Sequence, residues 1–317
     1  MSGEIEHFEV AKLASGMVLR LPLHRLEGAA KGPVLGITAA IHGDEVLPIE
    51  IIRQLLQRID KTALRGRILM LPVANPLAFE SCSRSTPVDM LNLNRIFPGS
   101  PNGWLSERIA NVICEQFMSK VNFYLDIHSG GNKGLVDFAF ICSDRQYALS
   151  LGLESYHSVG SLPNGLPSGT SLKAAQDYGV EGTAMELGGS DISYTLFVEK
   201  GVRAVLNLLR HLKMLDGSPI LPKEQRIFTN KAVLRTSSGG ILYSKVGFED
   251  LGSIFPKGTL LGEVISPYDF EVQEQLTAPF DENLLLHVPS MTTVFEAGEF
   301  AFQVGDMKGA EVLRSED

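Results

Sequence analysis

The sequence lacks paired cysteines, long apolar runs and an excess of basic residues. Its three cysteines, Cys82, Cys114 and Cys142, lie far apart and form no CxxC pair, so neither a disulfide framework nor a thiolate zinc site is expected. No run of roughly 18 apolar residues occurs, so no membrane-spanning helix is expected. The formal net charge of -9 argues against a nucleic-acid partner, because phosphate binding depends on clustered Lys and Arg.

The first ten residues, MSGEIEHFEV, also lack the basic-then-apolar layout of a signal peptide. We therefore expect a cytoplasmic enzyme or binding protein, and the sequence leaves open whether it forms a homo-oligomer. With 317 residues, 44% of them hydrophobic, the chain is long enough for a large core and for two domains.

From residue 31 to about residue 216, short apolar runs alternate with helical patterns. This alternation predicts an α/β fold, with a mostly parallel mixed sheet flanked by helices. The predicted strands are 33–41, 67–73, 123–127, 136–141 and 182–187, and the predicted helices are 46–59, 106–118 with Ser106 as cap, 145–156 and 194–215.

The character of the sequence changes after the Pro/Gly-rich segment 215–226. Short alternating segments at 232–237, 240–246, 259–266 and 300–305 are separated by Gly, Pro and Asp turns, which predicts a small all-β domain. We expect a catalytic domain over residues 1–220 and a C-terminal β domain over residues 221–317.

His42 and Glu45, in the segment AIHGDEV, lie between a predicted strand and a predicted helix. Both are good zinc ligands, and catalytic zinc sites use three protein ligands and a water. The HxxE pattern also occurs in ordinary solvated loops. No HExxH motif is present, so a zinc site carried on one helix is excluded.

His128 ends the predicted strand NFYLDIH and is the natural third ligand. Ligands of such sheets collect at the carboxyl ends of the strands, where His42 and Glu45 are also expected. Asp126 lies two residues earlier, so a regular strand points it to the same side, where it can accept the second imidazole N–H. A structural histidine with a structural hydrogen bond is the alternative.

Further candidates lie in GTAMELGG and in the irregular stretch 75–102. Glu186 stands in a small apolar strand, where a carboxylate needs a partner such as an attacking water. Arg84, Asn94 and Arg95 offer fixed positive charge and amide groups for a carbonyl or a carboxylate. Each of these residues also has an ordinary interpretation as a surface residue or an ion-paired residue.

Taken together, the ordered motifs HGDE, NP…SCSR, NLNRIFPG, DIHSG and MELGG resemble the succinylglutamate desuccinylase/aspartoacylase family, a branch of the zinc carboxypeptidase-like fold. The resemblance covers about residues 32–215, and the β domain is similar to that of bacterial members. The resemblance implies that His42, Glu45 and His128 bind Zn²⁺.

The same resemblance implies that Glu186 is the general acid/base and that Arg84 polarises the amide carbonyl. It implies that Asn94 and Arg95 bind the substrate carboxylate. Two departures stand out. Asn92 replaces an acid ahead of Leu93-Asn94-Arg95. The family's arginine before the catalytic glutamate, which grips an acidic substrate side chain, is missing. Gln176 stands near its place and Lys173 is close by.

The segment 245–264 resembles a biotinyl/lipoyl-type hammerhead, but no lysine follows between Lys257 and Lys308. We therefore expect the β domain to cap the cleft and not to act as a swinging-arm carrier. The predicted activity is zinc-dependent hydrolysis of a small N-acyl amino acid or related N-acyl amine, at the carbon-nitrogen bond of a linear amide. The alternatives are a zinc carboxypeptidase-type exopeptidase and a non-catalytic metal- or metabolite-binding protein.

Overall fold

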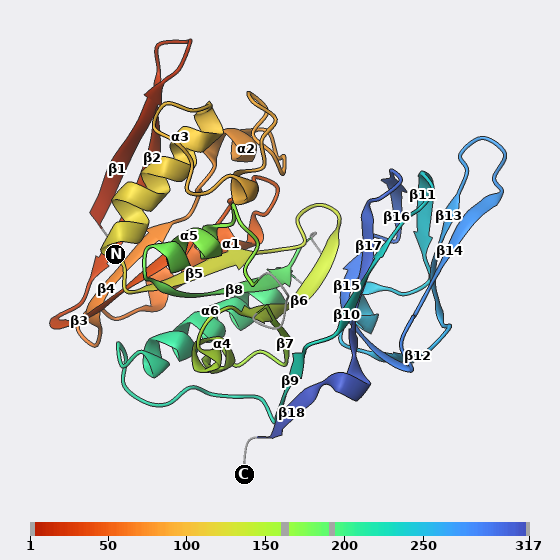
Figure 1. Cartoon of the computed structure of the whole chain (residues 1–317). Helices are drawn as coiled ribbons and strands as arrows, with labels where there is room; N and C mark the ends of the chain where they lie inside the picture. Colours follow the sequence, from red (N-terminus) through yellow and green to blue (C-terminus); the bar gives the residue numbers. More distant parts are fainter. Residues whose placement is uncertain (1–3, 160–164, 190–193, 315–317) are drawn as a thin grey trace.

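The computed structural model describes residues 4–159, 165–189 and 194–314 (Figure 1). The helices are α1 (Leu47–Arg58), α2 (Pro76–Glu80), α3 (Leu105–Val112), α4 (Arg145–Ser150), α5 (Ser171–Asp177) and α6 (Tyr194–His211), with a short 3-10 helix η1 (Leu93–Arg95). The first nine strands are β1 (Glu4–Lys12), β2 (Val18–Glu27), β3 (Ala30–Thr38), β4 (Arg65–Leu71), β5 (Phe123–His128), β6 (Gly134–Ile141), β7 (Ser155–Ser158), β8 (Glu181–Gly188) and β9 (Glu224–Phe228). The remaining strands are β10 (Lys231–Arg235), β11 (Gly240–Ser244), β12 (Ile254–Pro256), β13 (Leu260–Ile265), β14 (Val272–Thr277), β15 (Glu282–Pro289), β16 (Thr292–Phe295), β17 (Phe300–Asp306) and β18 (Glu311–Arg314).

A large mixed sheet organises the chain, in the order β1-β2-β4-β3-β5-β8-β6-β15-β17-β10. Strands β4, β3, β5 and β8 are parallel, and β8 and β6 are antiparallel. The C-terminal strand β15 pairs directly with β6, so the sheet continues from the first part of the chain into the last. Figure 1 shows the C-terminal strands β10, β15 and β17, coloured cyan to blue, together on one side of the molecule.

The two faces of the sheet bury different apolar clusters. Helices α1, α4 and α6 pack on one face, against alternate residues such as Leu125, Ile127 and Met185. Helices α3 and α5 belong to a second cluster, which includes Tyr124 of β5. Because side chains alternate along a strand, Asp126, His128 and their cross-strand partners lie on the face opposite Leu125 and Ile127.

A smaller sheet, β14-β13-β11-β16, lies in the C-terminal part of the chain. It encloses an apolar core together with residues of β15 and β17, including Leu285, Phe302 and Val304. The predicted fold class is confirmed: a mixed α/β sheet with flanking helices is followed by additional C-terminal strands that form a second sheet.

The predicted element types are mostly confirmed, with two corrections. The predicted helix 145–156 ends at Ser150, because Gly152 adopts a left-handed conformation (φ +71°), and residues 155–158 form strand β7. Ser106 is not the helix cap: it lies inside α3, where its hydroxyl donates to Asp89 at 2.8 Å. The sequence patterns do not predict several of the observed strands: the N-terminal hairpin β1–β2 and strands β9, β12, β14, β15, β16 and β18.

Within the described ranges, no helix combines the length and apolar character that a bilayer crossing needs. The cysteines are free thiols.

Candidate metal centre and active-site cavity

The loop after β3 carries His42 and Glu45 into the interior. Gly43 is needed there, because a Cβ at this position would lie 2.0 Å from the backbone carbonyl carbon of Ala78. The Gly43 N–H donates to the Ser83 carbonyl at 2.9 Å. The HGDE segment therefore packs closely against α2. Arg84, which follows Ser83, lies beside His42.

Three predicted ligands converge in the structure. His42 and Glu45 are each 3% exposed and His128 is 4% exposed. The Nδ1 atom of His42 lies 2.7 Å from Glu45 Oε1, and the Nδ1 atom of His128 lies 2.8 Å from Glu45 Oε2. One ligand atom of each residue lies within 4.8 Å of the others, so the sequence prediction that these side chains meet is confirmed.

The other ring nitrogens fit a metal-binding role for this group. His42 Nε2 lies 3.2 Å from Asn92 Oδ1, and His128 Nε2 lies 3.0 Å from Asp126 Oδ2. An acceptor behind each imidazole holds the Nε2 proton, so a metal would bind at Nδ1 in place of the Nδ1 proton that now faces Glu45. Two imidazoles and one carboxylate form a donor set found in catalytic zinc sites, so the residues present fit a zinc ion.

Asp126 is itself held firmly. Its Oδ1 accepts from Thr38 at 2.7 Å, and its Oδ2 accepts from Ser171 at 2.5 Å. Burial by itself would raise the pKa of Asp126, but the charge and hydrogen bond of His128 hold it below its ordinary value. Sequence reasoning found Asp126 but not Thr38 or Ser171, because neither belongs to a recognisable motif.

The charges within the metal group compensate one another. Burial would raise the pKa of Glu45, but the charges and hydrogen bonds of both histidines hold it well below its ordinary range. Burial would lower the pKa of His128, but Asp126 and Glu45 raise it well above its ordinary value. Burial lowers the pKa of His42, with Glu45 opposing the shift. A buried carboxylate between two imidazoles can persist only because of this mutual compensation.

Glu186 lies beside the metal group without belonging to it. On β8 it is in register with His128 of β5, and it lines the same cavity. Within the described ranges no hydrogen bond to its carboxylate is found, and only burial and the charges of neighbouring groups act on it. Burial raises the pKa of Glu186 to about 7; His128 opposes this shift and the negative charge of Glu45 adds to it. A carboxyl group with such a pKa is suited to accept and return a proton near neutral pH.

Arg84 and the η1 segment also adjoin the metal group. Arg84 Nη1 lies 3.3 Å from His42 Nδ1 and 3.5 Å from Glu45 Oε1. The Asn94 side-chain nitrogen lies 3.3 Å from His128 Nε2, and its oxygen accepts from the Ser171 N–H at 2.9 Å. Arg95 is exposed, and its guanidinium donates to the Asn94 carbonyl at 2.7 Å.

All the predicted site residues line one cavity of about 810 Å³. Neither Gln176 nor Lys173 lines it: Gln176 is exposed, and Lys173 forms an ion pair with Asp177. Sequence reasoning missed residues of the C-terminal strands and of β7 that line the same cavity, including Lys231, His287 and Gln303. No local motif marks them.

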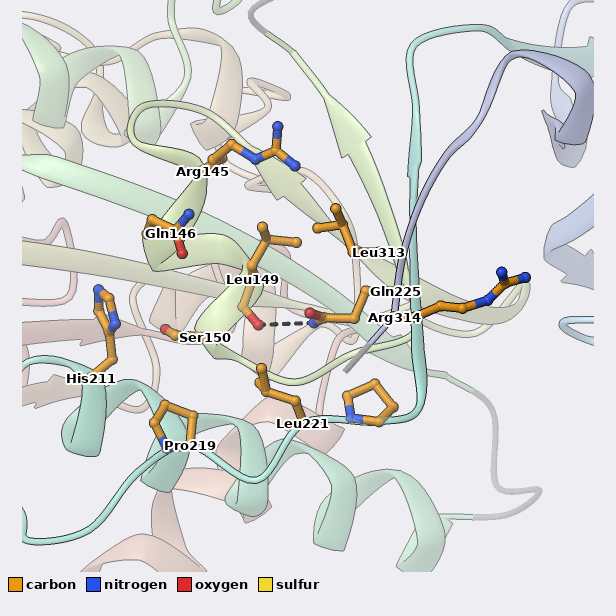
Figure 2. Close-up of a pocket in the computed structure, with 11 residues that line it drawn as sticks. Arg145, Gln146, Leu149, Ser150, His211, Pro219, Leu221, Gln225, Leu313 and Arg314 are labelled. Carbon is orange, nitrogen blue, oxygen red and sulfur yellow. Dashed lines mark hydrogen bonds between the residues drawn. The ribbon is translucent and has the colours of Figure 1, made fainter. Parts of the chain in front are cut away.

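A second cavity, of about 470 Å³, shares no lining residue with the first. Figure 2 shows the Gln225 side-chain amide donating to the Leu149 carbonyl in this cavity, at 2.9 Å. Its two arginines are already paired, Arg145 with Glu311 and Arg314 with Glu224. Among the described residues, those that line this cavity form no metal-binding group.

Comparisons with known proteins agree with this geometry. Residues 31–212 match the model of the succinylglutamate desuccinylase/aspartoacylase catalytic domain. The chain is 29% identical over 206 residues to N-alpha-acetyl-L-2,4-diaminobutyric acid deacetylase from Halomonas elongata, covering 62% of this chain but only 60% of that relative. It is 24% identical over 275 residues to succinylglutamate desuccinylase from Erwinia tasmaniensis, covering 78% of each.

Solved structures share the whole fold. The product-bound structure of the ectoine utilization protein EutE (DoeB) from Ruegeria pomeroyi matches with a TM-score of 0.83 at 23% identity, over 96% of both chains. A succinylglutamate desuccinylase/aspartoacylase from Rhodobacter sphaeroides matches with a TM-score of 0.81 at 19% identity, over 95% of this chain and 94% of that one. The likeness extends through the C-terminal strands.

Proposed function

Because the chain belongs to the succinylglutamate desuccinylase/aspartoacylase family, we propose that it is a zinc-dependent amidohydrolase that hydrolyses the amide bond of a small N-acyl amino acid or related N-acyl amine. The convergence of His42, Glu45 and His128 beside Glu186, in one cavity, carries this proposal. The two curated relatives support it, because their names describe removal of an acetyl and of a succinyl group from amino acids.

In this proposal His42, Glu45 and His128 hold the zinc ion through the two Nδ1 atoms and the Glu45 carboxylate. Bound zinc would supply Lewis acidity and bring the pKa of water down to ~7. Asn92 and Asp126 orient the two imidazoles from behind.

Glu186 accepts the proton of the attacking water and returns it to the leaving nitrogen as the C–N bond breaks. Its lack of a fixed partner and its raised pKa allow both transfers. Arg84 donates to the amide carbonyl oxygen as negative charge develops there. The products are a free carboxylate and a free amine.

Arg95, together with the Asn94 amide, binds a carboxylate of the substrate. The Arg95 guanidinium makes no ion pair within the described ranges, so its positive charge is available to a ligand. Burial lowers the pKa of the Arg95 guanidinium, and the positive charge of nearby Arg84 lowers it further. Two neighbouring cations favour an anionic substrate.

The test is a hydrolysis screen of N-acetyl, N-succinyl and N-formyl amino acids and diamines, with release of the free amine as the signal. We expect turnover that disappears after chelation and returns on addition of zinc. Release of amino acids from peptides, with no action on N-acyl amino acids, would instead identify an exopeptidase. Tight zinc binding without hydrolysis of any substrate would identify a binding protein.

A further inference from the structure

One continuous face of the large sheet forms the floor of the cavity. From the metal group outward, the register places His128 beside Glu186, Glu186 beside Phe138, and Phe140 beside His157. It then places Val136 beside His287, and His287 beside Gln303. Paired residues of neighbouring strands point to the same side of a sheet, so the cavity runs from the metal group into the C-terminal strands.

Lys231 lies on the same face of the sheet, on the edge strand β10. On β10, Val233 is in register with Gln303, and Lys231 lies two residues earlier, on the same side. It lines the cavity and is half-buried. Among the residues that the structure describes, its ammonium forms no hydrogen bond or ion pair, whereas Arg235 of the same strand donates to the Gly298 carbonyl at 2.7 Å.

The contacts that Lys231 does make leave its charge available. Its Nζ lies 5.6 Å from the centroid of the Phe140 ring, which attracts the cation but satisfies none of its three N–H donors. Burial lowers the pKa of Lys231 to about 8, with the negative charge of Glu186 opposing the shift. The side chain is therefore mostly protonated at neutral pH.

A second donor near this end of the cavity also lacks a partner. The Gln303 side-chain nitrogen is buried without a hydrogen bond to any described residue. His157 does not supply a donor: its Nδ1 lies 3.2 Å from the Phe228 carbonyl oxygen, so Nδ1 carries the proton and Nε2 has only a lone pair. An ammonium and an amide N–H together suit a carboxylate.

The order of the strands places Glu186 between Arg95 and Lys231, two residues with cationic side chains. Asn94 contacts His128 on β5, Lys231 lies over Phe140 on β6, and β8 with Glu186 lies between β5 and β6. Arg95 and Lys231 thus line the same cavity on the two sides of Glu186.

We propose that Lys231, with Gln303 beside it, is an anion-binding subsite for the acyl end of the substrate. The preferred acyl group then carries a terminal carboxylate, as in a monoamide of a dicarboxylic acid such as succinate. This inference rests on the proposed hydrolase function and sharpens it. This subsite would bind a second carboxylate of the substrate, at a position that includes neither Gln176 nor Lys173.

The kinetic test compares N-succinyl and N-acetyl derivatives of one amino acid. We expect the wild-type protein to prefer the succinyl substrate in kcat/KM. Lys231→Met should reduce this preference about 10- to 100-fold, the range of a lost charged hydrogen bond, mainly through KM, and Lys231→Arg should restore most of it. Lys257→Met is the matched control, because Lys257 is exposed and does not line the cavity.

A binding measurement separates this inference from the proposed function. Succinate and acetate are titrated calorimetrically into the zinc-loaded protein; both have one carboxylate for the metal side, so the difference between them reports on the second carboxylate. Tighter binding of succinate that is lost in Lys231→Met supports the subsite, even if no amide is hydrolysed. An unchanged succinyl preference in Lys231→Met, or no preference in the wild type, refutes the subsite even if hydrolysis is observed.

Discussion

The two walls of the cavity differ in how their polar groups are satisfied. The metal wall, formed by His42, Glu45, Asp126 and His128, gives each imidazole nitrogen and each carboxylate a partner. The C-terminal wall, formed by Lys231, His287 and Gln303, leaves the Lys231 ammonium, His287 Nδ1 and Gln303 Nε2 without hydrogen-bonding partners among the described residues.

This difference separates two tasks. Fully partnered groups are held in one geometry, which bond-breaking chemistry requires. Buried polar groups without partners destabilise the ligand-free protein. A ligand that forms hydrogen bonds with them removes this unfavourable free energy. We therefore expect changes in the metal wall to affect all substrates alike, and changes in the C-terminal wall to alter the ratio between substrates.

The largest effect is expected at Glu186, which lies between the walls. Glu186→Gln keeps the shape but cannot accept a proton, so kcat should fall by a factor of about 10² to 10⁴, equally for N-acetyl and N-succinyl substrates. The zinc content, measured on the same samples, should remain that of the wild type. Glu181→Gln, at an exposed position on the same strand, is the control. A kcat near the wild-type value would remove Glu186 from the mechanism.

Glu186 also predicts a pH dependence of stability in the metal-free protein. Burial raises its pKa from the ordinary 4.5 to about 7 in the folded state. Below pH 4.5 the group is protonated in both states and does not oppose folding. As the pH rises from 4.5 through 7, the unfolded chain gives up the proton first, so stability is lost.

In chelator, the wild type should therefore lose on the order of 2–3 kcal/mol relative to Glu186→Gln between pH 5 and pH 8. Urea unfolding of both proteins at the two pH values measures this difference. If the two proteins changed in parallel with pH, the carboxyl group would not be desolvated as the structure indicates.

The metal wall could be predicted from the sequence and the C-terminal wall could not. Buried parallel strands are short continuous apolar runs. His42 lies four residues after the end of β3 and His128 is the last residue of β5, so local pattern and topology locate both. Lys231 lies in an ordinary alternating strand. Its place in the cavity depends on the pairing of β15 with β6 and of β10 with β17, and no local pattern contains these distant pairings.

Strand β7 was missed for a related reason. It is only four residues long, Ser155–Ser158, and mostly polar, so no apolar run marks it, and the strand is fixed by pairing with β6 and β9. The same pairings bear on domain organisation. We propose, as the sequence predicts, a division near residue 220 into a catalytic unit and a β unit, although β9 and β15 pair with strands from before that point.

A smaller effect is expected behind the two imidazoles, where the metal wall is not symmetric. His128 has the carboxylate of Asp126 as its partner, whereas His42 has the neutral amide of Asn92. Asp126→Asn should weaken zinc binding about 10- to 100-fold, and Asn92→Ala should weaken it by about tenfold or less. Competition with a chelating dye gives both affinities. A larger loss for Asn92→Ala would show that His42, not His128, depends more on its partner.

The smallest effect is expected at the ion pair that joins the walls near the surface. Lys133, in the loop after β5, pairs with Glu299, just before β17. The two side chains are 56% and 32% exposed, and such pairs contribute only about 0–1 kcal/mol. A double-mutant cycle of Lys133→Ala and Glu299→Ala, followed by urea unfolding, should give a coupling energy in that range. The succinyl-to-acetyl ratio should stay near the wild-type ratio, because the β6–β15 ladder already fixes the walls relative to each other. A coupling energy above about 2 kcal/mol, or a shift in the ratio as large as that of Lys231→Met, would mean that this ion pair and not the backbone ladder positions the C-terminal wall.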